Sequence, residues 1–434
     1  MPPPTREVSR GALLLVVAAA ALPRLLVLAV ERDQILEEFV EKSDRFAQTL
    51  VASGTFGFLP GVPSAYTQPL YAFFLAGVYW PFGHSWLAVG LAQTLVAVAT
   101  ALIVFELGRR LRSTSVGVAA ALLTTLQPYV VWHDVHVNRE ILDGFLLAAL
   151  TLLGLLAFER RSAALGAATG AVAGLAVLGN ARLALLPVAL AVYVAWPARP
   201  VSQALLVGGA TVAASVLVVT PWLVRNEVSI GCAVITTDTR ALWKANNPAT
   251  YDLLAAGKWI DDVPNIPGVE LSPEFQAAIF ADRGELIEVD ECAQMRFYRD
   301  EVFDFWREQP GEKARLAGQA VRMLWSPTFS VEDDDPARGG LAETGRQVVE
   351  PLYALALYGL AVAGCFFAPR RFLALALLLL AYNTLAATVF AGTVRYRAPF
   401  DFLLALLAAF ALERAWHAIR TDDKAPAAAE GGRL

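Results

Sequence analysis

Long apolar stretches separated by short charged connections make up most of this chain. A transmembrane helix needs about 20 mainly apolar residues, or somewhat fewer where its ends are anchored, and stretches of this kind predict ten spans. The predicted spans cover residues 12–30, 85–107, 115–131, 140–158, 163–178, 183–196, 203–221, 351–367, 371–390 and 398–413. The pattern therefore predicts an all-α polytopic membrane protein.

A first long segment, 31–84, interrupts the pattern after the first span. It begins with an acidic cluster and continues through the turn-rich stretch 54–63. Residues 70–80 are apolar, but they stop at Pro81 and are too short to cross a bilayer. We therefore expect an interfacial or re-entrant helix in this first outer loop. The acids of the cluster are Glu31, Asp33, Glu37, Glu38, Glu41 and Asp44.

A second long segment, 222–350, carries 23 acidic and 13 basic residues, more than half of the 40 acids in the chain. Its periodicity predicts amphipathic helices at 273–281, 291–308 and 311–325. We expect an α-rich extracytoplasmic domain here. The chain then divides into spans one to seven with the first outer loop (1–221), this domain (222–350), and spans eight to ten with a tail (351–434).

Basic residues in the short connections predict the orientation, because cytoplasmic loops are enriched in Lys and Arg. The arginines that follow the even-numbered spans all lie on the same side of the membrane as Arg6 and Arg10. Both termini are therefore expected in the cytoplasm. A cleaved signal peptide is the alternative for the first span, but Pro23-Arg24 and the absence of a clean cleavage site favour a retained helix. The residues are Arg109, Arg110, Arg112, Arg160, Arg161, Arg199, Arg370, Arg371, Arg414 and Arg420.

Composition excludes several classes of function. With 56% hydrophobic and 17% charged residues and a mean hydropathy of +0.51, the chain cannot be a soluble enzyme. A net charge of −5 argues against a nucleic-acid partner, which needs a basic face. Three cysteines are too few for a disulfide scaffold or a thiolate zinc site. Cys232 and Cys292 both lie in the outer segment, where a disulfide is allowed, and the sequence leaves their pairing open.

Isolated arginines at the outer ends of the spans are the strongest chemical signal. Arginine grips phosphate oxygens bidentately, so these residues favour a lipid-phosphate substrate, although each can also anchor to lipid head groups. A carboxylate opposite can accept a proton from an attacking group, and Asp44, Asp134 and Glu140 are the candidates. Composition alone gives Asp44 no preference over the other acids of its loop. The arginines are Arg139, Arg182, Arg225, Arg395 and Arg397.

The sequence contains two candidate metal-binding sites. His133, Asp134 and His136 place two imidazoles and a carboxylate close together in the chain. The acidic run 332–335 is most simply a solvated loop, with a calcium site as the alternative. A divalent metal therefore stays open as a cofactor.

Several short sequence motifs resemble those of the glycosyltransferase family 39 members of the GT-C clan. This family includes protein O-mannosyltransferases and lipid A aminoarabinose transferases. One is the stretch 43–58, which begins Ser43-Asp44-Arg45-Phe46 and ends in a Gly-aromatic turn. It is followed by Gln68-Pro69-Leu70-Tyr71. Further matches in chain order are 220–226 (Thr-Pro-Trp-Leu-Val-Arg-Asn), 242–248 (Leu-Trp-Lys-Ala-Asn-Asn-Pro) and 395–400 (Arg-Tyr-Arg-Ala-Pro-Phe).

The resemblance implies a GT-C-like fold and an inverting transferase that takes a sugar from a polyprenyl-phosphate donor at the outer face of a bacterial plasma membrane. It implies that Asp44 is the catalytic base and that Asp134 or Glu140 is a second carboxylate. Tyr71 would line the cavity. The acceptor, a lipid, glycan or protein, is not implied. The residues that it assigns to the donor phosphate are Arg225, Arg395 and Arg397, and Arg182 is a further candidate.

The resemblance has departures, and two other classes of function remain open. Asp44 is followed by Arg45 where the protein mannosyltransferases carry an Asp-Glu pair, and Gln68 replaces the first proline of a family Pro-Pro pair. An O-antigen ligase or polymerase would also combine about ten spans with a large outer loop. A transporter or lipid flippase would show inverted repeats and mid-membrane polar groups, and the sequence shows no convincing halves.

Overall fold

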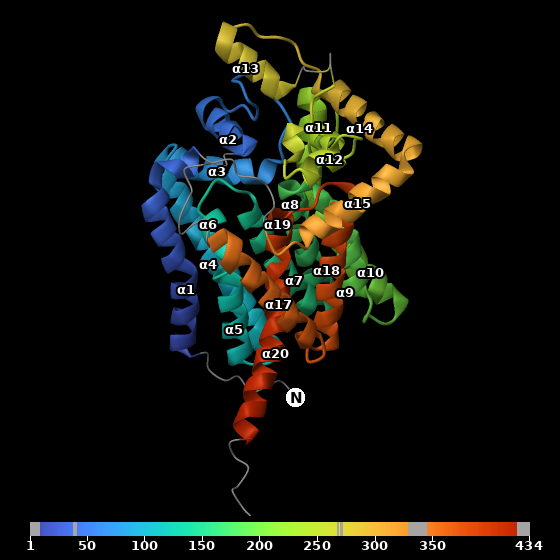
Figure 1. Ribbon diagram of the computed structural model, residues 1–434. Coiled ribbons are helices and arrows are strands. Elements are labelled where there is room, and N and C mark those ends of the chain that lie inside the picture. Colours follow the sequence, from blue (N-terminus) through green and yellow to red (C-terminus); the bar gives the residue numbers. More distant parts are fainter. Residues whose placement is uncertain (1–8, 38–40, 267–268, 270–271, 329–344, 423–434) are drawn as a thin grey trace, which may run out of the picture.

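The computed structural model describes residues 9–37, 41–266, 269, 272–328 and 345–422. Within these residues almost every regular element is a helix, and the β-structure recorded is one isolated bridge between Leu59 and Val62. Figure 1 shows an upright helical bundle with a second layer of helices packed across one end. Glu38 and the acidic run 332–335 lie outside the described residues.

Seven helices of the described chain are long and apolar enough to cross a membrane. Three shorter apolar helices, Thr114–Thr125, Ala163–Gly179 and Ala181–Ala195, occupy the places of the predicted third, fifth and sixth spans. The third predicted span is divided at Gln127-Pro128, because the residue before a proline disfavours helical backbone. The long helices are α1 (Arg10–Glu31), α4 (Trp86–Leu111), α7 (Glu140–Arg160), α10 (Val201–Ile230), α17 (Glu350–Cys365), α18 (Arg370–Val389) and α20 (Asp401–Asp422). The shorter bundle elements are α5 (Thr114–Thr125), α6 (Pro128–His133), α8 (Ala163–Gly179), η2 (Ala181–Leu183) and α9 (Leu186–Ala195).

The basic connections gather at one end of the bundle, as the orientation argument requires. Arg112 pairs with Glu413 at 2.8 Å, and Arg371 pairs with Glu159 at 3.1 Å. Figure 1 shows the start of α1 and the end of α20 at this same end, and the added layer of helices lies at the opposite end. The two ends of the bundle thus differ in both charge and architecture.

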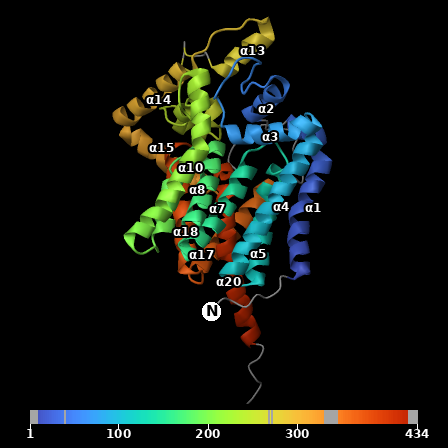
Figure 2. The same cartoon turned by 180° about the vertical axis from the view of Figure 1, so that it is seen from behind.

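The layer at the opposite end comes from the two long segments of the sequence. The first loop forms η1 (Arg32–Leu36), α2 (Lys42–Ser53) and α3 (Pro69–Phe82), and α3 lies across the end of the bundle (Figures 1 and 2). This matches the short interfacial helix expected at 70–80. The three helices predicted in the second segment are present as α13 (Pro273–Arg283), α14 (Glu291–Glu308) and α15 (Pro310–Leu324). The remaining elements there are α11 (Arg240–Lys244), α12 (Thr250–Ala255) and η3 (Ile260–Asp262).

Close contact between α8 and α10 depends on glycines four residues apart. A Cβ at Gly166, Gly170 or Gly174 would lie 2.7, 1.9 or 2.8 Å from backbone oxygens of α10. Small residues at this spacing let two helix backbones approach closely, so that packing replaces the hydrophobic drive that is missing inside a bilayer. These three glycines therefore let α10, which leads into the outer layer, pack closely against the bundle.

We predict that Gly170→Ala lowers the free energy of unfolding by about 1–3 kcal/mol, the usual cost of overpacking. Gly209→Ala is the matched control, because Gly209 lies in α10 with no atom within 4 Å of an added Cβ. The control should be neutral or slightly stabilising, since alanine favours helix. Unfolding of both variants in detergent measures the difference. Equal stability of the two variants would show that this packing does not depend on the glycine.

Candidate active site

An arginine held between two carboxylates lies where the bundle meets the outer layer. Arg395, in the short helix α19 (Val394–Arg397), donates through Nε to Glu140 Oε1 at 2.6 Å and through Nη2 to Glu140 Oε2 at 3.1 Å. Its Nη2 also donates to Glu41 Oε1. Arg139 Nε lies 3.7 Å from Glu140 and 4.0 Å from Glu41. We call these four residues the Arg395 cluster.

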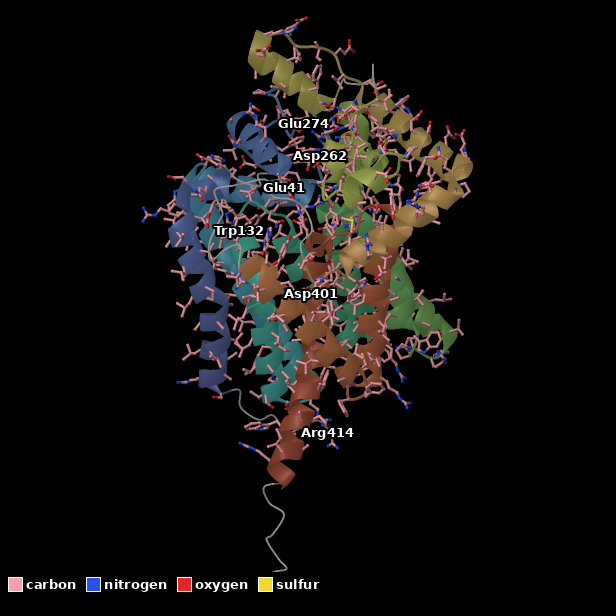
Figure 3. All side chains as sticks on the ribbon, in the orientation of Figure 1. Glu41, Trp132, Asp262, Glu274, Asp401 and Arg414 are labelled. Atoms are coloured by element: carbon pink, nitrogen blue, oxygen red, sulfur yellow. A yellow bond between two sulfur atoms is a disulfide. The ribbon has the colours of Figure 1, made fainter. Side chains whose placement is uncertain are left out.

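Local sequence places the acids of this cluster at helix N-termini. Glu140 is the first residue of α7, and its backbone N–H donates to Asn138 Oδ1 at 3.1 Å. Glu41 is the N-cap residue of α2. The positive end of the helix dipole favours acids at both positions. Figure 3 shows Glu41 at the boundary between the bundle and the outer layer, with Asp401 deeper and Arg414 near the opposite end.

Asp44 lies on the same helical turn as Glu41, three residues along α2, and is 5% exposed. Unlike Glu41 and Glu140, Asp44 has no arginine among its hydrogen-bond partners in the described residues. His84 Nε2 lies 3.0 Å from Oδ1, Gln48 donates to Oδ2 at 2.6 Å, and the Tyr79 hydroxyl donates to Oδ1. Burial, together with the neighbouring Asp44 charge, raises the pKa of Tyr79 well above its ordinary value, so Tyr79 stays a donor.

The outer segment holds the first loop in place. Lys42 pairs with Asp238 at 2.7 Å. Burial alone would raise the pKa of Asp238, but Lys42 and Arg240 outweigh burial and hold it below its ordinary value. Glu291 accepts from Ser64 Oγ at 3.1 Å, from the Ala65 N–H at 3.2 Å and from Thr237 Oγ1 at 2.7 Å.

A disulfide supports this arrangement. Cys232 and Cys292 are bonded, which resolves the pairing that the sequence left open. The bond joins the segment just after α10 to the start of α14, next to Glu291. The buried carboxylate that holds the first loop is therefore fixed covalently to the end of a bundle helix.

Arg397, predicted to bind the donor phosphate, is not part of the Arg395 cluster. Its side chain is buried, pairs with Asp401 at 3.1 Å and donates to the Ser326 carbonyl at 2.6 Å. Charge at this depth needs internal partners. Arg397 therefore links the start of α20 to the residues that follow α15.

Arg182 is close to the cluster but contacts different groups. Its guanidinium stacks on the Tyr396 ring at 3.9 Å and donates to the Ala391 carbonyl at 3.2 Å. Together with Glu140 and Asp143 it lines a cavity of about 10 Å³. Arg182 therefore holds the backbone between α18 and α19, just before Arg395, from the side of the bundle.

Arg225 lies beside a separate groove. It donates to the Ser64 and Phe56 carbonyls at 2.9 and 3.0 Å, and it stacks on Trp222. The groove has a volume of about 660 Å³ and mainly apolar walls. Its lining includes Leu50, Phe56, Phe73, Leu178, Val218, Pro221 and Trp222.

Two further predicted site residues are engaged inside the protein. Asp134 forms an ion pair with Arg24 at 2.5 Å, and both side chains are largely buried. Tyr71 is 1% exposed and donates to Gln93 Oε1 at 2.6 Å, so it is enclosed between helices. Of the two candidates for the second carboxylate, Glu140 belongs to the Arg395 cluster and Asp134 does not.

The candidate metal site is not assembled. His133 stacks on Tyr129, and His136 stacks on Trp132, while Asp134 pairs with Arg24. Burial lowers the pKa of His136, which keeps its imidazole neutral. Among the residues that the structure describes, no group of three or more His, Cys, Asp or Glu side chains is placed to hold a metal ion.

Sequence reasoning missed Glu41 as a site residue, although it named Glu41 among the loop acids. The usable signal was its position three residues before Asp44, since residues i and i+3 share a helix face. His84 and Tyr79 were also missed. Tyr79 lies within the apolar stretch 70–80 and His84 follows it, and nothing in their local sequence distinguishes them from interfacial aromatic residues.

We predict that Asp134→Asn destabilises the protein by about 3–5 kcal/mol, because it leaves the Arg24 guanidinium buried without a counter-charge. Combining Asp134→Leu with Arg24→Met should recover most of that loss. Asp304→Asn, which breaks an exposed pair with Arg307, is the control and should cost less than about 1 kcal/mol. Thermal unfolding in detergent measures all three. A stable Asp134→Asn protein would contradict the structural role given to this residue.

Comparison with known proteins bears on the fold. Residues 63–224 match the family model of dolichyl-phosphate-mannose-protein mannosyltransferase. No curated protein sequence matches the chain at a significant level. The matched region includes Arg139, Glu140 and Arg182.

Solved structures align over nearly the whole chain. The oligosaccharyltransferase of Archaeoglobus fulgidus, tethered with an acceptor peptide, aligns with a TM-score of 0.54 at 16% identity, over 97% of this chain and 51% of that one. Its apo form aligns with a TM-score of 0.51 at 14% identity, over 98% and 53%. ArnT from Cupriavidus metallidurans bound to undecaprenyl phosphate aligns with a TM-score of 0.42 at 15% identity, over 96% and 81%.

The chain spans about half the length of the archaeal oligosaccharyltransferase that it matches. At these identities the likeness concerns the fold. The GT-C resemblance predicted from the local strings is confirmed by the family match and by these alignments. The protein is a multi-pass helical membrane protein with the GT-C glycosyltransferase fold.

Proposed function

We propose that this protein is an inverting membrane glycosyltransferase that moves a sugar from a polyprenyl-phosphate donor to an acceptor. The GT-C fold and the mannosyltransferase family match support a glycosyl transfer enzyme. The observation that carries the proposal is the Arg395 cluster, in which two arginines and two carboxylates meet, with Asp44 three residues beyond Glu41 in α2. Arginines to bind the leaving phosphate and a carboxylate to take the proton of the acceptor are the minimum set of charged groups for this reaction.

Arg395 is the proposed contact for the donor phosphate, with Arg139 next to it. A guanidinium offers planar paired donors that match phosphate oxygens. The Arg395 side chain is 33% exposed, whereas that of Arg397 is 2% exposed. In the structure Glu41 and Glu140 neutralise Arg395, and an incoming phosphate would take over part of that role. The developing negative charge on the leaving phosphate is then stabilised by donors already in position.

Asp44 is the proposed base that takes the acceptor's proton. Glu41 and Glu140 both contact the Arg395 guanidinium and serve as its counter-charges. Asp44 contacts only neutral or titratable donors, and His84 at 3.0 Å offers a group to which the proton can pass. Attack by the deprotonated acceptor on the face opposite the phosphate would invert the anomeric carbon.

The groove beside Arg225 is proposed to hold the apolar chain of a lipid-linked substrate. Its walls are aliphatic and aromatic, and it lies along α10, a helix long and apolar enough to cross a membrane. Apolar walls with a few polar groups are typical of ligand sites. Arg225 holds the stretch 56–64 against this groove, since it donates to backbone carbonyls at both ends.

We place the site on the extracytoplasmic side of a bacterial plasma membrane. The basic helix ends lie at the opposite end of the bundle, and cytoplasmic loops are the ones enriched in arginine. The Cys232–Cys292 disulfide lies on the site's side and suits an oxidising compartment. Both termini would then be cytoplasmic.

Binding of undecaprenyl phosphate to the purified protein in detergent tests the proposal without a guess at the sugar. We expect saturable binding by the parent and a 10- to 100-fold weaker affinity for Arg395→Ala, since a hydrogen bond to a charged group contributes about 1.5–3 kcal/mol. Asp44→Asn should bind as the parent does. Arg45→Ala is the matched control for Arg395→Ala, because it removes an exposed arginine from α2, the helix that carries Asp44.

Two results would count against the proposal. A folded parent that does not bind the lipid phosphate would favour a transporter of another substrate. An Arg395→Ala protein that binds as tightly as Arg45→Ala would remove the phosphate from this cluster. Transfer assays with native lipid-linked sugars then separate binding from turnover, because Asp44→Asn should abolish only turnover.

A further inference from the structure

The carboxyl-terminal end of α18 is held by side chains from the outer segment. α18 ends at Val389, six residues before Arg395. The last carbonyls of a helix have no partner within it. Here Asn246 Nδ2 donates to the Val389 carbonyl at 2.9 Å, and Lys313 Nζ donates to the Thr388 carbonyl at 2.7 Å. A cation at this end is also favoured by the helix dipole.

Asn246 has every polar group of its side chain used. It is 0% exposed. Its amide donates to the Leu242 carbonyl at 2.8 Å as well as to Val389, and its oxygen accepts from Trp306 Nε1 at 3.0 Å and from Lys313 Nζ. One buried amide thus joins α11, α14 and α15 to the end of α18. Such fully satisfied buried networks are rigid and geometrically specific.

The turn after α18 is closed from two more sides. A Cβ at Gly392 would lie 1.7 Å from the Ala320 carbonyl of α15, so the turn lies directly against that helix. From the bundle, Arg182 donates to the Ala391 carbonyl. The backbone from Thr388 to Gly392 is therefore fixed just before α19 begins.

The same outer segment also contacts the first loop. The Thr237 N–H donates to the Ala65 carbonyl at 2.9 Å, and Asp238 pairs with Lys42. Residues 237–246 consequently contact both the loop that carries Glu41 and Asp44 and the turn that leads to Arg395.

We propose that Asn246, together with Lys313, is a positioning residue that sets the place of Arg395 relative to α2 by anchoring the end of α18 to the outer segment. This inference rests on the proposed function, because Arg395 is assigned there to the donor phosphate. Asn246 itself acts through backbone and has no contact with Arg395. Its loss should move the guanidinium without removing it.

A double-mutant cycle with undecaprenyl phosphate as the probe tests this role. We expect Asn246→Ala and Lys313→Met each to weaken binding about tenfold, since each removes hydrogen bonds that hold the α18 end. In the Arg395→Ala background neither change should weaken binding further, because a residue that acts through Arg395 has nothing left to position. Lys313→Arg should restore most of the binding. Asn247→Ala is the matched control, since Asn247 is also buried but its side chain bonds only to 243, 244 and 249.

Hydrogen–deuterium exchange of the same proteins gives a readout that needs no ligand. Asn246→Ala and Lys313→Met should speed exchange in residues 388–397, and Asn247→Ala should not. Unchanged exchange there, or losses of binding that add to the Arg395→Ala loss, would overturn the inference. A parent that fails to bind would instead count against the proposed function, and the exchange pattern would still decide whether Asn246 anchors this turn.

Discussion

The ion pairs around Arg395 are the interaction on which the rest of this arrangement depends. They join three segments that lie far apart in the chain, because Glu41 and Glu140 stand 354 and 255 residues from Arg395. Charges at the edge of an apolar bundle are costly unless they are paired. Pairing one guanidinium with two carboxylates satisfies these charges and brings the first loop, the start of α7 and α19 to one point, with Asp44 one helical turn away.

The remainder of the molecule can be understood as support for that point. Glycines at four-residue spacing bring α8 against α10 and fix the helix that leads into the outer segment. The disulfide joins that helix to Glu291, and Glu291 holds the first loop. Lys313 and Asn246 hold the turn before Arg395. Buried polar groups that are fully hydrogen-bonded specify one geometry, and a transferase needs its charges placed before the substrate arrives.

Hydropathy predicted most of the fold. The ten apolar stretches, the interfacial helix at 70–80 and the three outer helices correspond to helices of the structure, because length and periodicity act locally. The site was only partly predictable. Of the isolated arginines, Arg139 and Arg395 meet at Glu140, whereas Arg397 and Arg225 are engaged by Asp401 and by backbone carbonyls. Likewise Asp134 pairs with Arg24. Which arginines lie against Glu41 and Glu140 depends on tertiary packing, which no local pattern reports.

The most direct test of the account is to locate the phosphate of undecaprenyl phosphate in a cryo-electron microscopy structure of the protein in lipid nanodiscs. The account predicts phosphate density in contact with the Arg395 guanidinium, at least one of Glu41 and Glu140 displaced from it, and the chain leading toward the apolar groove along α10. Phosphate density at the basic end of the bundle, or at a site where Arg395 keeps both carboxylates, would contradict it.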